Sequence, residues 1–195
     1  IWKYAAAVVL LIGLFNAIYF KSYIFNHNEE ITYTEIIVPK GQIKNILLPD
    51  STLVYINSGS KLKYDSNFGK KNRQVYLEGE AYFDVIHNSK KQFIVHTSEY
   101  DIKVLGTAFN VSAYLCDNIH QTSLERGKIV LIDKQKKETV LKPNETYLLI
   151  RNKKQSKSYK VEDITKCSSW RNGKIFFRNQ TFENIAKELE RTHNI

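Results

Sequence analysis

The stretch VYLEGEAYFDV, residues 75–85, decides the fold class of this chain. Small and apolar residues fall on its odd positions, from Val75 to Val85, while tyrosines and acids fall on its even positions. Because successive side chains of a strand point to opposite faces of a sheet, this alternation predicts one unbroken β-strand with a buried odd face. Gly79 and Ala81 are expected to keep that face narrow for close packing.

The acids of this stretch, Glu78, Glu80 and Asp84, all lie on the even face. The backbone positions of Glu78 and Glu80 would be about 6.5 to 7 Å apart, which would suit a pair of glycosidase carboxylates. Such a pair needs surroundings that separate its two pKa values, whereas neighbours on one regular strand face share theirs. No calcium-binding loop accompanies the acids. We therefore expect a solvated or salt-bridged face near the basic segment 70–73, with no catalytic residue.

The sequence pattern from Ile31 to Tyr159 is typical of an all-β domain. Short runs rich in Ile, Val, Tyr, Phe and Leu are interrupted about every ten residues by Gly, Pro, Asn or Asp. This pattern predicts a short-stranded β-solenoid, a barrel or a sandwich of the jelly-roll kind. No linker rich in Gly or Pro divides the region. We therefore expect one β domain over residues 34–165, preceded by a linker at 26–33.

Residues 1–25 differ from the rest because the 17 residues from Tyr4 to Phe20 carry no charge. At about 1.5 Å per residue this run is about 25 Å long, a little short of the roughly 30 Å core of a bilayer. Flanking aromatic residues and lysines extend the span, so a single transmembrane helix is predicted. A signal-peptide core and a buried helix are the alternatives. Lys3 and Lys21 balance each other, so charge gives no orientation.

The pattern changes near the C-terminus. Lys174–Arg178 (KIFFR) predicts a strand, and Thr181 is a plausible N-cap for a helix. The apolar residues at helical spacing after this cap are Phe182, Ile185, Ala186 and Leu189. We expect a small α+β module over residues 166–195. Since the chain opens on Ile1 rather than Met and closes within this pattern, we also expect it to be a segment of a longer protein.

Signatures of catalysis and of metal binding are largely absent from the sequence. There is no nucleophile elbow and no phosphate-binding glycine loop, and the five histidines lack metal-ligand spacing. We therefore expect no enzyme, no cofactor and no metal site. Cys116 and Cys167 would be able to pair in an oxidising compartment or to remain separate thiols, and the sequence leaves both open.

Positive charge is concentrated in residues 134–160. This segment has nine Lys or Arg residues against Glu138 and Glu145, and so supplies +7 of the net charge of +9. No recognised nucleic-acid-binding motif accompanies the lysines, and we expect no nucleic-acid partner. Solvated hairpin turns are favoured, followed by attraction to anionic lipid or to an acidic partner.

Several blocks of the chain, taken together, resemble the FecR family of membrane-bound sigma-factor regulators. The blocks follow one another in the family's order over residues 48–68 (LPDSTLVYINSGSKLKYDSNF), 75–85, 93–114 (FIVHTSEYDIKVLGTAFNVSAY), 122–131 (TSLERGKIVL) and 141–149 (LKPNETYLL). The segment from Trp170 onward resembles the start of a small module that is similar to the N-terminal domains of secretins and TonB-dependent receptors. One departure is the turn that commonly reads P-D-G-S, which here reads Pro49-Asp50-Ser51-Thr52.

The resemblance implies a single-pass inner-membrane signalling protein whose β domain lies in the periplasm. In such a protein an outer-membrane TonB-dependent transducer contacts the periplasmic part. The signal then reaches an extracytoplasmic-function sigma factor through a cytoplasmic domain that would precede Ile1, and it controls uptake genes for iron chelates or glycans. We place the transducer contact at Ile175, Phe177 and Arg178. The alternative function is an anchored periplasmic β domain that binds carbohydrate or cell wall.

The stretch IKVLGTAFNV, residues 102–111, changes its alternation between Leu105 and Ala108. This change predicts a bulge or turn at Gly106. Some members of the FecR family cut themselves between a Gly and a Thr at the matching place, so the resemblance makes Gly106 and Thr107 candidates for self-cleavage. The Thr107 hydroxyl would attack the Gly106 carbonyl in an N-to-O acyl shift. A bulge without chemistry is the alternative.

Overall fold

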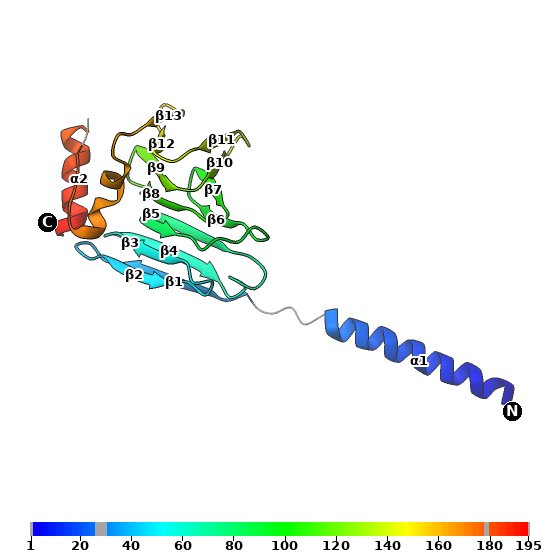
Figure 1. Cartoon of the computed structure of the whole chain (residues 1–195). Helices are drawn as coiled ribbons and strands as arrows, with labels where there is room; N and C mark the ends of the chain where they lie inside the picture. Colours follow the sequence, from blue (N-terminus) through cyan, green and yellow to red (C-terminus); the bar gives the residue numbers. More distant parts are fainter. Residues whose placement is uncertain (1, 26–30, 178–179, 195) are drawn as a thin grey trace. The chain divides into compact units, whose positions relative to one another are not determined.

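A computed structural model describes residues 2–25, 31–177 and 180–194 of the chain (Figure 1). Contacts divide the chain into two compact units, Ile1–Thr32 and Tyr33–Ile195. The boundary expected near residue 165 stays a prediction, and most of the linker expected at 26–33 lies outside the described residues.

The first unit contains helix α1, Trp2–Phe25, over the range in which a helix is predicted. The side chains from Val8 to Phe20 are exposed. The side-chain amide of Asn16 donates a hydrogen bond of 3.0 Å to the carbonyl of Ile12, one turn earlier. Among the residues that the structure describes, none of the helices combines the length and the apolar character needed to cross a membrane.

The second unit is an all-β domain of thirteen described strands followed by two short helices. The strands are β1 (Tyr33–Val38), β2 (Lys44–Leu47), β3 (Leu53–Ile56), β4 (Ser60–Asp65), β5 (Gln74–Asp84), β6 (Phe93–His96), β7 (Tyr100–Val104), β8 (Ala108–Ala113), β9 (Ile119–Arg126), β10 (Ile129–Asp133), β11 (Glu138–Leu141), β12 (Glu145–Ile150) and β13 (Gln155–Lys160). The helices are the 3-10 helix η1 (Ile164–Asn172) and the α-helix α2 (Phe182–His193).

The strands form two facing sheets that share β5. Sheet A has the order β1-β4-β5-β6-β7-β10-β11, and sheet B has the order β2-β3-β5-β8-β9-β12-β13. After β5 the chain alternates between them: hairpin β6–β7 lies in sheet A, β8–β9 in sheet B, β10–β11 in sheet A and β12–β13 in sheet B. The predicted all-β class is confirmed, and the two facing sheets correspond to the jelly-roll-like alternative.

The core fills the space between the two sheets. Phe83 of sheet B stacks on Phe109 with ring centroids 5.2 Å apart and meets Phe93 of sheet A at 5.9 Å. Tyr100 of sheet A meets Tyr147 of sheet B edge to face at 5.3 Å. All five rings are buried. These aromatic contacts join the sheets into one hydrophobic core.

Strand β5 makes the sandwich possible because it passes from one sheet to the other. Its first half pairs with β4 and β6 in sheet A, and its second half pairs with β3 and β8 in sheet B. Gly79 lies at the junction with φ +112°, and a Cβ there would collide with Ser60. Only glycine fits that conformation and that approach. The predicted odd face is buried throughout, from Val75 to Val85.

The predicted irregularity at Gly106 is also confirmed. Strand β7 belongs to sheet A and β8 to sheet B, so the chain must bend between them. The bend falls on Leu105 and Gly106, and the β8–β9 register shifts between Ala108 and Phe109. The change of alternation seen in the sequence marks this crossing between sheets.

The predicted strand at Lys174–Arg178 is wrong over residues 174–177, which form no strand, and Arg178 lies outside the described residues. A strand needs a partner to satisfy its backbone groups, and none of the described strands pairs with this segment. The predicted helix is confirmed as α2, whose N-cap Thr181 accepts a hydrogen bond from the backbone of Asn184 at 3.3 Å.

Candidate functional site

Helices η1 and α2 lie beside sheet B (Figure 1), and we name them together the C-terminal cover. Trp170 of η1 is buried against Tyr82 of β5 and Ala108 of β8, whose side chains point away from the core. Tyr55 of β3 completes this second apolar cluster. The cover therefore closes over part of the face of sheet B that the sequence predicts to be solvated.

The three acids of β5 have different surroundings. Glu78 is exposed, opposite Lys61 of β4, and Asp84 forms an exposed ion pair of 2.7 Å with Arg126. Both fit the predicted solvated or salt-bridged face. Glu80 does not, because the cover and its neighbours enclose its carboxylate. The prediction of a solvated even face is therefore wrong at Glu80.

The two carboxylate oxygens of Glu80 are both occupied. Asn57 donates its side-chain amide to Oε2 and Asn110 donates its amide to Oε1, each at 2.8 Å. The carbonyl oxygen of Asn110 in turn accepts the indole N–H of Trp170 at 3.1 Å. A chain of hydrogen bonds thus runs from the cover to a carboxylate in the middle of β5.

Burial raises the pKa of Glu80 to about 7, even though some of its side chain remains accessible. The two amide donors favour the ionised form, but the loss of hydration outweighs them. Of the cover's charges, Glu188 raises this pKa further and Arg191 lowers it. Because both oxygens of Glu80 are held by asparagine amides, the pair Glu78 and Glu80 is not presented to a substrate.

Two arginines hold the cover on sheet B. The guanidinium of Arg171 lies 3.5 Å from the ring centroid of Tyr82 and 5.3 Å from that of Tyr55. Arg191 bonds Asp117 at 2.9 Å and lies 4.0 Å from the ring centroid of Tyr114. These contacts are polar and cation–π, unlike the apolar contacts of the core.

Helix α2 contacts the β domain by its polar side. The Arg191–Asp117 pair is largely shielded, with 13% and 16% of the two side chains exposed, and Gly41 donates its backbone N–H to the carbonyl of Arg191 at 2.8 Å. No residue of α2 is buried among those described, and Phe182 is 85% exposed. The other apolar residues at helical spacing, Ile185, Ala186 and Leu189, are half-buried, so the apolar stripe of α2 is only partly covered.

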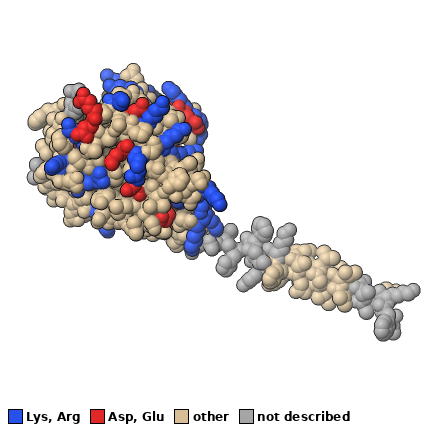
Figure 2. All heavy atoms as spheres, in the orientation of Figure 1, with Lys and Arg blue, Asp and Glu red and all other residues tan. Residues whose placement is uncertain are grey.

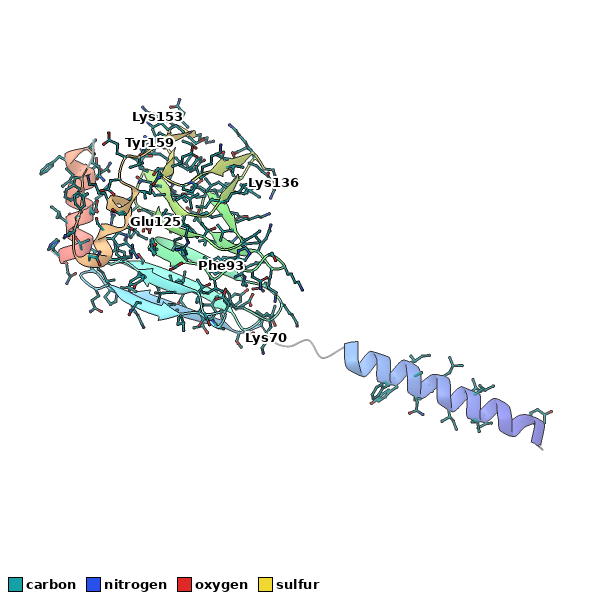
Figure 3. All side chains as sticks on the ribbon, in the orientation of Figure 1. Lys70, Phe93, Glu125, Lys136, Lys153 and Tyr159 are labelled. Carbon is teal, nitrogen blue, oxygen red and sulfur yellow. The ribbon has the colours of Figure 1, made fainter. Side chains whose placement is uncertain are left out.

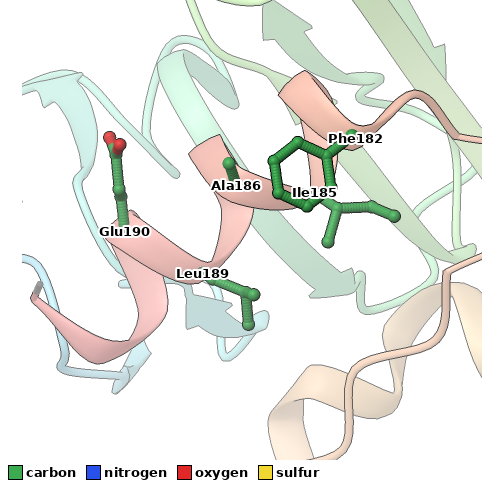
Figure 4. Close-up of a pocket in the computed structure, with 5 residues that line it drawn as sticks. All are labelled: Phe182, Ile185, Ala186, Leu189 and Glu190. Carbon is green, nitrogen blue, oxygen red and sulfur yellow. The ribbon is translucent and has the colours of Figure 1, made fainter.

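The apolar stripe of α2 lines a shallow groove of about 380 Å³. Figure 4 shows the lining residues along one side of the helix: Phe182, Ile185, Ala186, Leu189 and Glu190. Of the residues predicted to contact a partner, Ile175 is half-buried and Phe177 is exposed, while Arg178 lies outside the described residues. Phe182 at the start of the stripe is the most exposed of these apolar side chains, and Phe176 and Phe177 of the segment before it are exposed as well.

The Gly106–Thr107 peptide lies in a tightly packed bend. A Cβ at Gly106 would lie 2.6 Å from the Cα and 2.7 Å from the imidazole Nδ1 of His87. Thr107 is only 1% exposed, and its hydroxyl donates a hydrogen bond of 3.1 Å to the carbonyl of Lys128. The bend therefore packs His87 closely against Gly106, while the hydroxyl of the next residue, Thr107, is held by Lys128. Self-cleavage at this peptide stays a prediction.

The basic side chains of residues 134–160 fall into two groups: those that form ion pairs within the domain and those that lie exposed on the hairpin turns. Arg151 pairs with Glu99 at 3.2 Å and donates to the carbonyls of Leu115 and Asp117, and Lys134 also pairs with Glu99 at 3.2 Å. Basic side chains gather at the end of the domain that carries β12 and β13 (Figure 2). Figure 3 labels Lys136 and Lys153 on the turns there, both exposed. The predicted solvated turns are thus confirmed, apart from Arg151 and Lys134.

The two cysteines do not pair: Cys116 is an exposed thiol, and Cys167 is a half-buried thiol in η1. No group of three or more His, Cys, Asp or Glu side chains is placed to hold a metal ion within residues 2–25, 31–177 and 180–194. Among the described residues, the candidates for a functional site are therefore the cover, the Gly106 bend and the basic hairpins.

Comparisons with known proteins agree with this architecture. The family model described as FecR protein matches residues 34–130. A crystal structure at 2.50 Å of a "putative anti-sigma factor" from Parabacteroides distasonis ATCC 8503 is 35% identical with a TM-score of 0.79, covering 84% of this chain and 76% of that one. A second, at 1.65 Å, is 35% identical with a TM-score of 0.78 and coverage of 83% and 75%. A search of curated proteins finds no match.

These likenesses define the class of the protein as an anti-sigma factor built on an all-β domain. The chain belongs to the FecR family. The resemblance noted in the sequence is confirmed, and membership of this family implies a sigma factor as a partner. It also favours a role in binding over one in catalysis.

Proposed function

We propose that this protein is a membrane-anchored anti-sigma factor that receives a signal in the periplasm and passes it to a sigma factor in the cytoplasm. The observation that carries the proposal is the apolar stripe on α2, which stays partly accessible at the surface of this FecR-family domain, with Phe182 85% exposed. An anti-sigma factor that responds to a signal needs a surface that a second protein can grip. The stripe supplies such a surface.

The second protein is proposed to be the signalling domain of an outer-membrane TonB-dependent transducer. It would dock on the stripe, with Phe182 and Leu189 as central anchors, and extend to the segment that holds Ile175, Phe177 and Arg178. Large apolar side chains at the centre of an interface carry most of its binding energy. Docking would regulate an extracytoplasmic-function sigma factor and thereby uptake genes for iron chelates or glycans.

The membrane anchor is proposed to be α1. Its support is the uncharged run from Tyr4 to Phe20, with aromatic residues and lysines at both ends. The proposed location is a single pass through the inner membrane, with the β domain in the periplasm. The test is fractionation of cells: the intact protein should resist extraction with alkaline carbonate, and a version without residues 1–25 should be released. Equal extraction of both would contradict the anchor.

The signalling role is tested in cells that carry the full-length protein, its sigma factor and a reporter gene under that sigma factor. The double variant Phe182→Asp/Leu189→Asp should lose the response to the transducer's ligand. Glu183→Gln, also on α2 but outside the groove, serves as the control and should respond normally. A normal response in the double variant would exclude the stripe as the receiving surface.

A further inference from the structure

We propose that the edge of the sandwich formed by β1 and β2 rests on a lipid bilayer, with its exposed apolar side chains in the headgroup region. We name this surface the entry edge, and its apolar residues are Tyr33, Ile37, Ile43 and Leu47. The inference rests on the membrane anchor of the proposed function, and it adds which side of the β domain meets the bilayer. Three features carry it: the exposure of these side chains, the contrast with the opposite edge, and the length of chain that follows α1.

The entry edge exposes an unusual number of large apolar side chains. Tyr33 and Ile37 lie on β1, Leu47 ends β2 and Ile43 directly precedes it, and the four are between 45% and 67% exposed. Among the described residues of the β domain, no other stretch of the same length exposes as many. Single exposed apolar residues are common, but a group of them on one surface usually marks a place where another surface binds.

Strands β1 and β2 are also unprotected as edge strands. Among the described strands, β1 pairs with β4 alone and β2 with β3 alone. Proteins normally guard such edges with charged side chains. The opposite edge, where β11 and β13 lie (Figure 1), follows this rule, because β13 carries Lys157 and Lys160 and is exposed throughout. The entry edge has one charged residue on each strand, Glu35 and Lys44, and its other outward side chains include the apolar group. This edge therefore needs a cover of a different kind.

The position of the entry edge in the chain indicates what covers it. Helix α1 ends at Phe25 and β1 begins at Tyr33, and eight residues of chain reach at most about 28 Å when fully extended. A bilayer that holds α1 would therefore keep Tyr33 within that distance of the end of its anchor. Five strands separate β1 from β11 in sheet A, which puts the opposite edge about 29 Å further along the sheet. The anchor thus favours contact at the entry edge.

The entry edge suits the headgroup region better than the hydrocarbon core. Lipid tails cannot satisfy the free backbone groups of an edge strand, whereas water and headgroups can. Tyrosine is enriched at this depth of a membrane, and the exposed Lys40 and Lys44 can extend toward the lipid phosphates. Surface-bound helices bury their apolar side about 5–10 Å into the boundary between headgroups and acyl chains, and we expect a similar depth for the side chains of this edge.

The test places a tryptophan on each edge and measures which one meets lipid. The full chain is reconstituted in phosphatidylcholine vesicles with bromine on the acyl chains, which quenches nearby indoles. Leu47→Trp probes the entry edge, and Val140→Trp, exposed on β11, probes the opposite edge of sheet A. Both proteins carry Trp2→Phe, and the buried Trp170 adds the same background to each. The emission of the new indole should fall about twofold or more in Leu47→Trp, because it lies about 5–10 Å into the boundary, and should not change in Val140→Trp.

Equal quenching of the two proteins, or no quenching of Leu47→Trp, would overturn the proposal. Quenching confined to Val140→Trp would also overturn it and would place the basic hairpins on the bilayer instead. If Leu47→Trp is unquenched and light scattering gives twice the mass of one chain, a second copy covers the edge and the proposal is refuted. Ile37→Trp repeats the probe on β1, and circular dichroism checks that every variant folds.

A separate variant tests the anchor, so that its failure is distinguished from failure of the entry edge. Leu10→Trp, in the middle of α1 and also combined with Trp2→Phe, should be quenched if α1 lies in the bilayer. Quenching of Leu10→Trp without quenching of Leu47→Trp would refute the entry edge and leave the anchor intact. Quenching of Leu47→Trp without quenching of Leu10→Trp would refute the anchor and show that the edge binds lipid by itself.

Discussion

Glu80 shows how one residue can depart from the pattern of its strand. It sits on the even face of β5 like Glu78, yet it lies under the cover and holds two asparagine amides. The parity of the stretch predicts its direction correctly. Parity does not predict what covers that face, because the covering residue Trp170 lies far downstream. Tyr82 could have indicated such a cover, because it places a large aromatic side chain on the face that was expected to be solvent-exposed.

The asparagine that connects Glu80 to the cover should be costly to replace. Asn110→Ala leaves one oxygen of Glu80 and the indole N–H of Trp170 without a partner, and we expect a loss of about 2–3 kcal/mol in the free energy of unfolding. Urea denaturation measures the loss. Asn45→Ala, exposed on edge strand β2, is the matched control and should change stability by less than about 0.5 kcal/mol. Equal losses in both variants would contradict the role given to Asn110.

The predicted self-cleavage between Gly106 and Thr107 depends on two side chains, those of Thr107 and His87. If the hydroxyl of Thr107 attacks the Gly106 carbonyl, the amide C–N bond breaks, the Thr107 amine is freed and an ester joins the two residues; hydrolysis of that ester by water then divides the chain. The full-length protein should therefore give two bands on a denaturing gel, and Thr107→Ala should give one. His87→Ala should slow the cleavage, because the imidazole lies beside the peptide and can take the proton. One intact band for the parent protein, unchanged in both variants, would exclude self-cleavage at the Gly106–Thr107 peptide.

Among the strands and helices, the predictions that are confirmed are those that depend on a local sequence pattern. The alternation of β5 and the slip at Gly106 predict a strand and a crossing between sheets, because burial between the two sheets fixes the direction of each side chain. The apolar spacing of α2 and its cap Thr181 predict a helix for a similar local reason. The strand predicted over Lys174–Phe177 does not form. A strand depends on a partner elsewhere in the chain, and local composition does not show whether one exists.

Helix α2 should detach more easily when its ion pair is lost. Arg191→Ala removes the bond to Asp117 and the contact with the Tyr114 ring, and we expect hydrogen exchange in α2 to rise about 10- to 100-fold, equivalent to about 1.5–3 kcal/mol. Lys187→Ala, which breaks only the exposed pair with Glu183, should cost about 0.3–0.5 kcal/mol. Equal exchange in the two variants would show that Arg191 does not hold the helix.

On the scale of the β domain, the cover is held by the buried Trp170 of η1 and by the polar side of α2, whose apolar stripe stays partly exposed. This arrangement separates two tasks. The contacts of Arg171, Arg191 and Trp170 hold the cover on sheet B, while the stripe offers an apolar surface to a partner. We therefore predict that a partner binds the cover rather than the sheets or the basic hairpins.

Titration calorimetry with the purified signalling domain of the proposed TonB-dependent transducer tests this claim most directly. The parent chain should bind the domain, Phe182→Asp/Leu189→Asp should bind at least about 100-fold more weakly because two apolar anchors are lost, and Lys136→Ala/Lys153→Ala should bind like the parent. The thermal unfolding of the β domain should be the same in all three proteins. An unchanged affinity in the Phe182/Leu189 variant, or a loss confined to the lysine variant, would contradict the role of the cover as the receiving surface.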